Sequence, residues 1–244
     1  MPNPALMQWQ AQVAGIEHEL AGISSVERAL ALGGHAGLPP AYLLGFSTAG
    51  IGKAIVAFGN PDTAATTVTY VPGVGTALTG ALSNSQRAAN LWLQAHRGGP
   101  DRSLSSIFWL DYNAPRRGLS LAGLMADRQI GSIADAVAGA KSLAGFQAGL
   151  VAAHVAGVPD RTVLLGHSYG SLVVGEATAH DGVRPDDIIF VGSPGVGVNH
   201  AAQLGILAGH VWAGANVNDP IPDMPPHAET LLAQGSGGQR GGRQ

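Results

Sequence analysis

Residues 162–175, Thr-Val-Leu-Leu-Gly-His-Ser-Tyr-Gly-Ser-Leu-Val-Val-Gly, combine three local signals in fourteen positions. An apolar run ending at Leu165 predicts a short buried strand, and an apolar, helix-compatible segment follows Gly170. Between them, residues 166–170 (Gly-His-Ser-Tyr-Gly) match the G-x-S-x-G pattern. In this strand–turn–helix setting the pattern predicts a nucleophile elbow, with Ser168 above the carboxyl end of a sheet.

The chemistry of an elbow explains the two glycines. A nucleophile on a sharp turn needs strained backbone angles, and Gly166 and Gly170 lack the Cβ atoms that would crowd the turn. The N–H of Tyr169, at the start of the new helix, is placed to face a developing oxyanion. The pattern alone is weak because 36 of the 244 residues are glycine, so an ordinary Gly-Ser turn is the alternative. Its position between a strand and a helix favours the nucleophile.

Composition limits the function classes. Apolar residues make up 45% of the chain and charged residues 12%, with a net charge of −3, which argues against a disordered chain and against a nucleic-acid binder. The chain has no cysteine, which excludes disulfides and thiolate nucleophiles. Residues 1–20 contain no basic residue and no unbroken apolar core, and no apolar run approaches eighteen residues. We therefore expect no signal peptide, no membrane span and a cytoplasmic protein, unless export uses no N-terminal signal.

The N-terminal region predicts one long helix, about residues 4–32, ended by Gly33-Gly34. Its apolar residues recur at intervals of three and four: Leu6, Trp9, Val13, Ile16, Leu20 and Ile23. Such a stripe is typical of a helix packed on its own domain, which is our expectation. It also fits a seam between two helices, so self-association through this helix stays open.

The middle of the chain predicts strands followed by helices. Residues 41–46 and 53–58 suggest an antiparallel hairpin, and residues 66–71 form a β-branched strand. That strand runs into a Gly-rich loop, residues 72–76, before a helix at about 78–96. In a hydrolase sheet this loop supplies the second oxyanion N–H, from Val74 or Gly75, although an ordinary tight turn is the alternative.

Further elements alternate in the same way. The expected strands are 105–110, 162–165, 187–191 and 210–214, and the expected helices are 130–156, 171–180 and 200–207. This order predicts an α/β fold of the α/β-hydrolase type: a mostly parallel sheet with helices on both faces, plus the N-terminal helix. We expect one domain over residues 1–234, with residues 1–38 as its N-terminal helical segment. Residues 235–244 lack apolar side chains and predict a disordered tail.

A serine nucleophile needs a base and an orienting acid, which follow it in the order acid, then histidine, in α/β-hydrolases. Asp219 lies in the loop after the second strand beyond the elbow, where such an acid belongs, with Asp223 in reserve. Asp186 and Asp187 start a strand, at the wrong end of the sheet. His227 is the only histidine after Asp219, whereas His180, His200 and His210 precede it. Order and elimination therefore predict Ser168, Asp219 and His227 as the triad.

Other site chemistries have little support. The nine histidines show no H-x-H or H-E-x-x-H spacing, and no G-x-G-x-x-G follows a strand. We expect no metal and no cofactor. Asp111 follows a strand and could line a site, but a structural role is preferred.

Four segments together resemble a known family. They are residues 59–64 (Gly-Asn-Pro-Asp-Thr-Ala), 70–76 (Tyr-Val-Pro-Gly-Val-Gly-Thr), 166–171 (Gly-His-Ser-Tyr-Gly-Ser) and 191–197 (Val-Gly-Ser-Pro-Gly-Val-Gly). With Asn218-Asp219-Pro220, they resemble the actinobacterial α/β-hydrolase family once catalogued as the domain of unknown function DUF1023, over about residues 4–226. The resemblance implies an α/β-hydrolase fold, Ser168 as nucleophile and Asp219 as acid, and no known substrate.

This chain departs from the family pattern at one end. Family members usually continue past the Asp-Pro loop with segments that carry a histidine, whereas here a Gly-rich tail follows. Either His227 has taken the role of base, or the chain lacks one. The first case predicts a serine hydrolase acting on a small ester or lipid-like substrate. The second predicts a non-catalytic hydrolase-fold protein that binds a ligand or partner.

Overall fold

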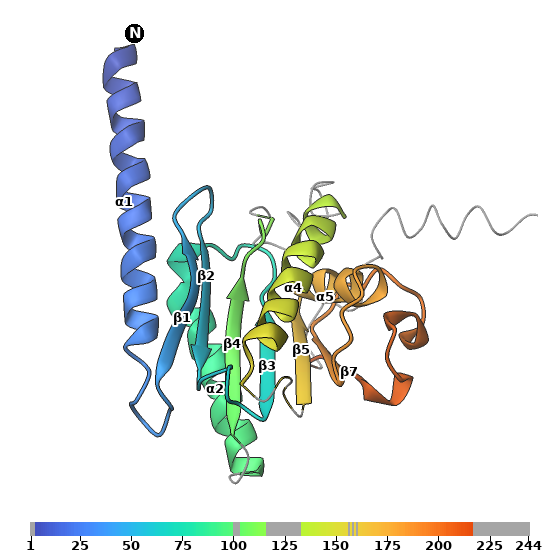
Figure 1. Cartoon of the computed structure of the whole chain (residues 1–244). Helices are drawn as coiled ribbons and strands as arrows, with labels where there is room; N and C mark the ends of the chain where they lie inside the picture. The colour runs from blue at the N-terminus through green and yellow to red at the C-terminus, as the bar shows by residue number, and fades with distance from the viewer. Residues whose placement is uncertain are drawn as a thin grey trace, which may run out of the picture. The chain divides into compact units, whose positions relative to one another are not determined.

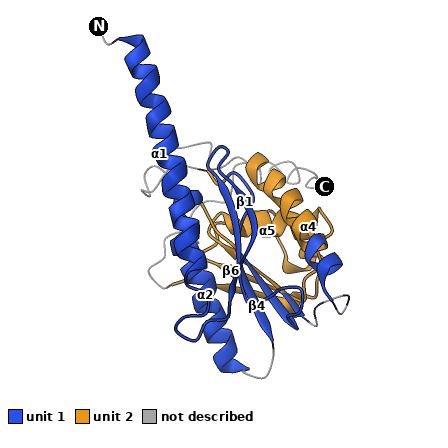
Figure 2. Ribbon diagram, turned by 60° about the vertical axis from the view of Figure 1, so that its left-hand side comes forward, with its two compact units in different colours: residues 1–70, 76–113, 149–162 blue, residues 71–75, 114–148, 163–244 orange. Residues whose placement is uncertain are grey.

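A computed structural model describes residues 3–99, 103–115, 133–155, 157, 159 and 161–216. The chain divides into two compact units (Figure 2). Unit 1 comprises residues 1–70, 76–113 and 149–162, and unit 2 comprises residues 71–75, 114–148 and 163–244. The predicted single domain over 1–234 is not tested by this division and stays a prediction. The predicted tail, 235–244, lies outside the described residues.

Unit 1 is built on four strands in the order β1-β2-β4-β3 (Figure 1). They are β1 Ala41–Ser47, β2 Lys53–Phe58, β3 Thr66–Val71, whose last residue belongs to unit 2, and β4 Leu104–Leu110. The predicted hairpin is confirmed, since β1 pairs antiparallel with β2, which pairs antiparallel with β4. Strands β3 and β4 are parallel.

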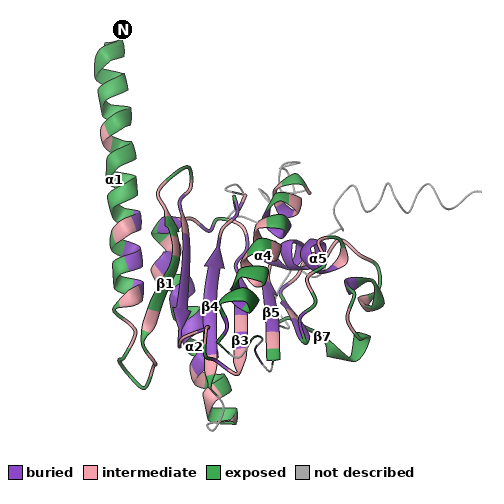
Figure 3. Ribbon diagram, viewed as in Figure 1, coloured by how far each residue is buried: buried purple, intermediate pink, exposed green. Residues whose placement is uncertain are grey.

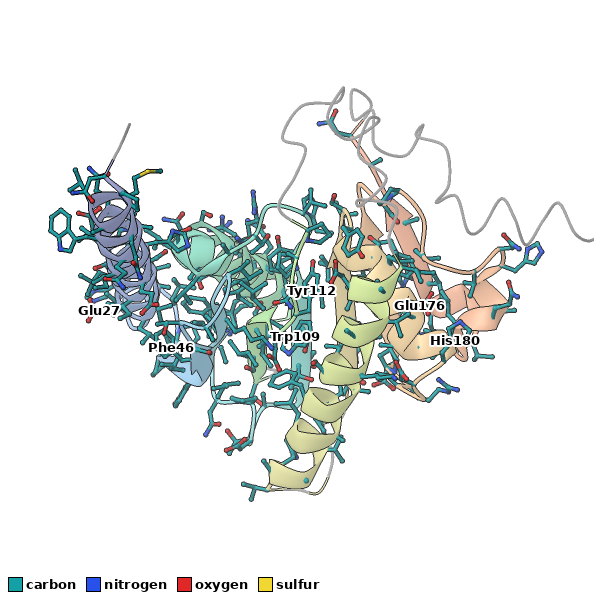
Figure 4. All side chains as sticks on the ribbon, turned by 90° about the horizontal axis from the view of Figure 1, so that it is seen from above. Glu27, Phe46, Trp109, Tyr112, Glu176 and His180 are labelled. Carbon is teal, nitrogen blue, oxygen red and sulfur yellow. The ribbon has the colours of Figure 1, made fainter. Side chains whose placement is uncertain are left out.

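The core of unit 1 follows from the strand sequences. Strand β2 is apolar throughout after Lys53, and β4 is apolar from Ile107 onward. Val56, Phe58, Ile107, Phe108 and Trp109 are fully buried. Helix α2, Ala81–Gly98, packs against them after a short 3₁₀ turn, η1, Leu78–Gly80. Trp109 stacks on Tyr112 with ring centroids 6.1 Å apart (Figure 4). Apolar strands without alternation are those of a sheet covered on both faces.

Unit 2 is parallel throughout its described strands. Strand β5, Arg161–His167, of which residues 163–167 belong to unit 2, pairs with β6, Asp187–Val191, and β6 pairs with β7, Val211–Gly214. Helix α4, Ala134–Ala153, enters unit 2 with its first fifteen residues, and α5, Gly170–Ala179, follows β5. Every residue of α5 from Gly170 to Thr178 is buried. The mostly parallel α/β sheet predicted from the sequence is therefore confirmed.

One predicted helix is wrong. Instead of a helix over 200–207, the chain forms two 3₁₀ segments, η2 Ala201–Leu204 and η3 Ala208–His210. Gly205 ends the first with a left-handed φ of 74°, a conformation that stops an α-helix. A second glycine, Gly209, follows four residues later, so the segment has no stretch long enough for a stable helix.

Helix α1, Pro4–Leu30, is confirmed, but the expected packing of its apolar stripe is wrong. The residues that it buries are Gly22, Ser25, Val26 and Ala29, near its C-terminal end. Gly22 admits the side chain of Leu78 from η1, because an added Cβ would lie 2.9 Å from Leu78 Cγ. The stripe itself is largely exposed: Leu6 by 50%, Trp9 by 60%, Ile16 by 59% and Leu20 by 56%. Figure 3 shows the exposed N-terminal part of the helix.

The Ser25 hydroxyl links α1 to the start of α2 by hydrogen bonds, and removing this hydroxyl is expected to destabilise unit 1. The fully buried hydroxyl donates to the Thr79 carbonyl at 2.9 Å and accepts from the Leu82 N–H at 3.0 Å. Ser25→Ala leaves both backbone groups without this partner, so we expect a loss of about 2 kcal/mol of unfolding free energy in urea titrations. Ser24→Ala, at the exposed neighbouring position, should change it by less than about 0.5 kcal/mol. Equal unfolding free energies for the two variants would contradict a stabilising role for the two hydrogen bonds of Ser25.

By length and composition, one helix of the described residues, α4, could cross a bilayer. A core helix satisfies the same criterion, so this is weak evidence.

Candidate active site

Ser168 sits in a strained turn between β5 and α5. Its φ is +54°, and among the described residues Ala36 is the only other non-glycine residue with a positive φ. For a residue with a Cβ this left-handed conformation costs on the order of 1 kcal/mol, so the surroundings must hold it. The backbone at Ser168 therefore makes the sharp strand-to-helix turn that the sequence predicts for a nucleophile elbow.

Three hydrogen bonds hold the turn. The Ser168 N–H donates to the Val191 carbonyl at 3.0 Å, which extends the pairing of β5 with β6 by one residue. The Ser168 carbonyl accepts from the Ser171 N–H at 2.9 Å, and the Ser171 hydroxyl donates to the Gly166 carbonyl at 3.1 Å. With both backbone groups of Ser168 bonded, the turn is fixed by the end of β6 and by the first residues of α5.

Both motif glycines are needed for space. A Cβ added to Gly166 would lie 2.7 Å from Ser171 Cα, inside the turn itself. A Cβ added to Gly170 would overlap the Val71 carbonyl oxygen and lie 2.5 Å from that of Pro72. The absence of a Cβ at Gly166 therefore allows the sharp turn itself, as expected. The absence of a Cβ at Gly170 allows the end of β3 to pack closely on the start of α5.

The part of the Gly-rich loop that belongs to unit 2, residues 72–75, lies beside the hydroxyl of Ser168. A Cβ on the buried Gly73 would be 2.6 Å from Ser168 Cβ and 3.0 Å from Ser168 Oγ. The Gly75 N–H donates to the Pro115 carbonyl at 2.8 Å. Of the two predicted donors, Gly75 is thus engaged with protein backbone. Nothing in the sequence singles out Gly73, whose lack of a side chain lets the loop approach Ser168 closely.

Tyr169 anchors the first turn of α5 to α4. Its side chain is 1% exposed, and the Ala136 N–H hydrogen-bonds its oxygen. Burial raises the pKa of this phenol well above its ordinary value, and the nearby carboxylates of Asp135 and Glu176 raise it further. The Ala136 N–H opposes them only in part. The residue whose N–H is predicted to face the oxyanion is therefore locked in place by its own side chain.

We expect Tyr169→Phe to remove part of the alkaline destabilisation of the protein. A raised folded pKa means that the unfolded phenol, which ionises near pH 10, loses its proton first. The stabilisation from the buried phenol is fully present below about pH 10 and is lost as the pH rises further. Above pH 10 this one group lowers the unfolding free energy by up to about 1.4 kcal/mol per pH unit. Urea titrations from pH 8 to pH 11 should show a smaller decline for Tyr169→Phe than for wild type. Identical declines would contradict the burial of an uncharged phenol here.

The described histidines that follow Ser168 are each engaged elsewhere. Nδ1 of His210 lies 3.2 Å from Oδ1 of the buried Asp187, and Trp212 donates to the same oxygen at 3.4 Å. Asp187 pairs with Val163, which places it about 16 Å along the strands from Ser168. The prediction that Asp187 lies at the wrong end of the sheet is confirmed.

The other two lie at the ends of helical segments. Nε2 of His180, the residue that follows α5, lies 3.7 Å from Oε2 of Glu176, four residues earlier (Figure 4). The His200 side chain accepts from the backbone at the third position of η2 and caps that segment. Both are structural or surface residues in the described chain, as predicted for His200.

Asp111, in unit 1, has an ion-pair partner. Its Oδ1 lies 2.7 Å from Nζ of Lys53, and both side chains are 37% exposed. This contact agrees with the structural role preferred from the sequence. Asp219 and His227, the predicted acid and base, lie outside the described residues, so their roles stay predictions.

Comparison with known proteins agrees with this architecture. An alpha/beta hydrolase family model matches residues 48–229. The chain is 35% identical over 188 residues to the uncharacterized protein Rv2079 of Mycobacterium tuberculosis (strain ATCC 25618 / H37Rv), covering 75% of this chain and 27% of that protein. It is 37% identical over 143 residues to the uncharacterized protein Rv0963c of the same strain, covering 58% of this chain and 49% of that protein.

The chain thus spans about a quarter of the length of Rv2079. Among solved structures, a Pyrobaculum calidifontis esterase matches with a TM-score of 0.38 and 16% identity, over 80% of this chain and 59% of that one. The family match covers most of the chain, and the mycobacterial relatives fit the actinobacterial α/β-hydrolase family that the motifs resemble. The chain belongs to the alpha/beta hydrolase family.

Proposed function

We propose that this protein is a serine hydrolase that cleaves carboxylic esters through an acyl-enzyme on Ser168. The observation that carries the proposal is the backbone of Ser168, held at a φ of +54° between a parallel strand and a buried helix. Strain of this kind clusters at functional sites. The approach of Gly73 to the Ser168 hydroxyl supports it, because that loop is where hydrolases provide an oxyanion donor.

In the proposed reaction, His227 takes the proton of Ser168 as Oγ attacks the ester carbonyl carbon. The carbonyl oxygen becomes an oxyanion, for which the N–H groups of Tyr169 and Val74 are the donors; Val74 is chosen because the Gly75 N–H is engaged. The intermediate expels the alcohol, which takes the proton from His227. Water, deprotonated by His227, then attacks the acyl-enzyme and releases the carboxylic acid, returning the proton to Ser168.

Asp219 is proposed to orient His227, and chain length permits this. The pairing of β5, β6 and β7 aligns His167 with Val191 and Val191 with Gly214. Two strand spacings, about 10 Å, therefore separate Gly214 from His167 at the edge where Ser168 lies. Asp219 follows Gly214 by five residues, which span up to about 17 Å when extended. His227, eight residues further on, has a longer reach.

The substrate class rests on the scaffold. A small ester or lipid-like molecule is proposed because ester cleavage is the commoner use of an α/β-hydrolase elbow, which is an argument by analogy. The mycobacterial relatives are uncharacterized proteins and give no substrate.

Labelling with a fluorophosphonate probe tests the proposal, since the probe phosphonylates only activated serines. Rapid labelling of wild type, lost in both Ser168→Ala and His227→Ala, is the expected result. Labelling lost only in Ser168→Ala would assign the base to another residue. A folded wild type that takes no label would refute the proposal and favour a non-catalytic member of the family.

A further inference from the structure

We propose that two copies of this chain associate through α1, along the stripe formed by Leu6, Trp9, Val13, Ile16, Leu20 and Ile23. These residues recur with spacings of 3, 4, 3, 4 and 3. This is the a/d pattern of a coiled-coil seam, in which apolar residues follow a 3.5-residue period. The inference is independent of the proposed hydrolase activity, because no residue of the stripe belongs to the candidate site.

The stripe faces away from unit 1. With 100° per residue, its mean direction lies roughly 160° around the helix from that of the buried face, Gly22, Ser25, Val26 and Ala29. Apart from Val13 and Ile23, which are half-buried, the stripe residues are at least 50% exposed. The helix therefore has two opposite contact faces, and its own unit occupies only one of them. Figures 1 and 3 show the N-terminal part of α1 extending beyond the strands of unit 1.

An unpartnered helix of this composition is costly in water. Residues before Gly22 have no buried member, so about 18 residues of helix project with little tertiary support. Isolated helices of this length are marginal, and exposed large apolar side chains add to the cost. Pairing of two stripes removes both costs.

The area available matches a small dimer. The four exposed stripe residues present on the order of 100 Å² each, and the half-buried Val13 and Ile23 add roughly 50 Å² each, so one stripe offers about 500 Å² and two together about 1,000 Å². Specific interfaces begin near that size. We therefore expect a weak dimer, with a dissociation constant of about 1–10 µM.

The flanking charges permit self-pairing. The positions beside the stripe are Gln10, Gln12, Glu17 and Glu19. In a parallel pair Gln12 faces Glu17 of the second copy, and in an antiparallel pair each glutamate likewise faces a glutamine, so no like charges meet. A membrane surface fits less well, since α1 carries Glu17, Glu19 and Glu27 against a single basic residue, Arg28.

Sedimentation velocity of the full chain tests the proposal between about 0.5 and 100 µM, a range that brackets the expected constant. We expect wild type to pass from one chain of 24.7 kDa to twice that mass. Ile16→Glu with Leu20→Glu should weaken association at least about 100-fold, because two carboxylates would be buried in the seam. The matched control is Ala11→Glu, an exposed position on the opposite face, which should dimerise like wild type.

The substituted positions are exposed, so circular dichroism should show the same helix content in each variant at low concentration. A wild type that stays monomeric throughout the range would overturn the proposal. So would a dimer that survives the double substitution, which would place the interface elsewhere. If monomeric wild type binds vesicles of phosphatidylcholine and phosphatidylglycerol and the double variant does not, the stripe is a membrane-contact surface and the proposal fails.

Discussion

Ser168→Ala is expected to lower kcat/KM for p-nitrophenyl ester hydrolysis by about 10³–10⁶-fold. The change removes the only atom that forms the proposed acyl-enzyme, whereas the oxyanion donors remain. Losses of this order accompany removal of a triad serine, and the residual rate comes from the oxyanion hole and from binding. Steady-state turnover with a short-chain p-nitrophenyl ester measures the effect, after correction for spontaneous hydrolysis.

Ser193→Ala is a matched control. Ser193 lies in the loop after β6, one residue further from its strand than Ser168 is from β5. Its hydroxyl is held in a local turn, where it accepts from the Gly195 N–H at 3.2 Å. We expect this variant to keep activity within about fivefold of wild type, since only a turn contact is lost. Activity that survives Ser168→Ala but disappears in Ser193→Ala would reassign the nucleophile.

Ser168→Gly separates the loss of the nucleophile from a loss of folding. Glycine adopts a φ of +54° without the Cβ penalty, so the unfolding free energy should rise by roughly 1 kcal/mol while hydrolysis is lost as in Ser168→Ala. A variant that is both inactive and more stable would show that the serine is retained at the expense of stability. A Ser168→Gly variant with a lower unfolding free energy than wild type would contradict the proposed backbone strain at Ser168.

The elbow could be predicted from sequence because its constraints are local. The strand, the tight turn and the helix lie within fourteen residues, and the clash that requires Gly166 involves Ser171, five positions away. Gly170 is less local: its neighbours are Val71 and Pro72, almost a hundred residues earlier. The motif contains that glycine, but only the structure shows which backbone it admits.

The choice between the two predicted oxyanion donors could not be made from sequence. Val74 and Gly75 are equivalent in a Pro-Gly-Val-Gly loop, and the difference between them is the carbonyl of Pro115, forty residues further along the chain. The packing of α1 was missed for a related reason. The helix docks through Gly22, Ser25, Val26 and Ala29, of which only Val26 is a sizeable apolar residue, whereas its conspicuous stripe points to solvent. Asp219 and His227 remain predictions, made from order along the chain and from the family resemblance.

Gly170→Ala is expected to destabilise the protein by about 3 kcal/mol and to lower kcat/KM at least about 100-fold. Gly170 is helical, so alanine suits its backbone and would by itself favour folding by up to about 1 kcal/mol. The added Cβ, however, overlaps the Val71 carbonyl oxygen and meets that of Pro72 at 2.5 Å. Both neighbours are backbone atoms that no side-chain rotation can move, so the overpacking cost exceeds the gain.

The activity should fall because the displaced segment is the loop that holds Gly73 against Ser168 and carries the proposed Val74 donor. Removing one oxyanion donor typically costs about 10²–10³ in rate.

Gly145→Ala, in α4, makes the same chemical change where no atom outside the local helix backbone lies within 4 Å of the new Cβ. It should stabilise the protein by about 0.5–1 kcal/mol with unchanged turnover. If Gly→Ala raises the unfolding free energy at position 145 and lowers it at position 170, then glycine is required at position 170 because the loop after β3 packs closely there. A Gly170→Ala variant with the stability and turnover of wild type would contradict this close packing of the loop. It would also contradict the proposed role of the Val74 N–H as an oxyanion donor.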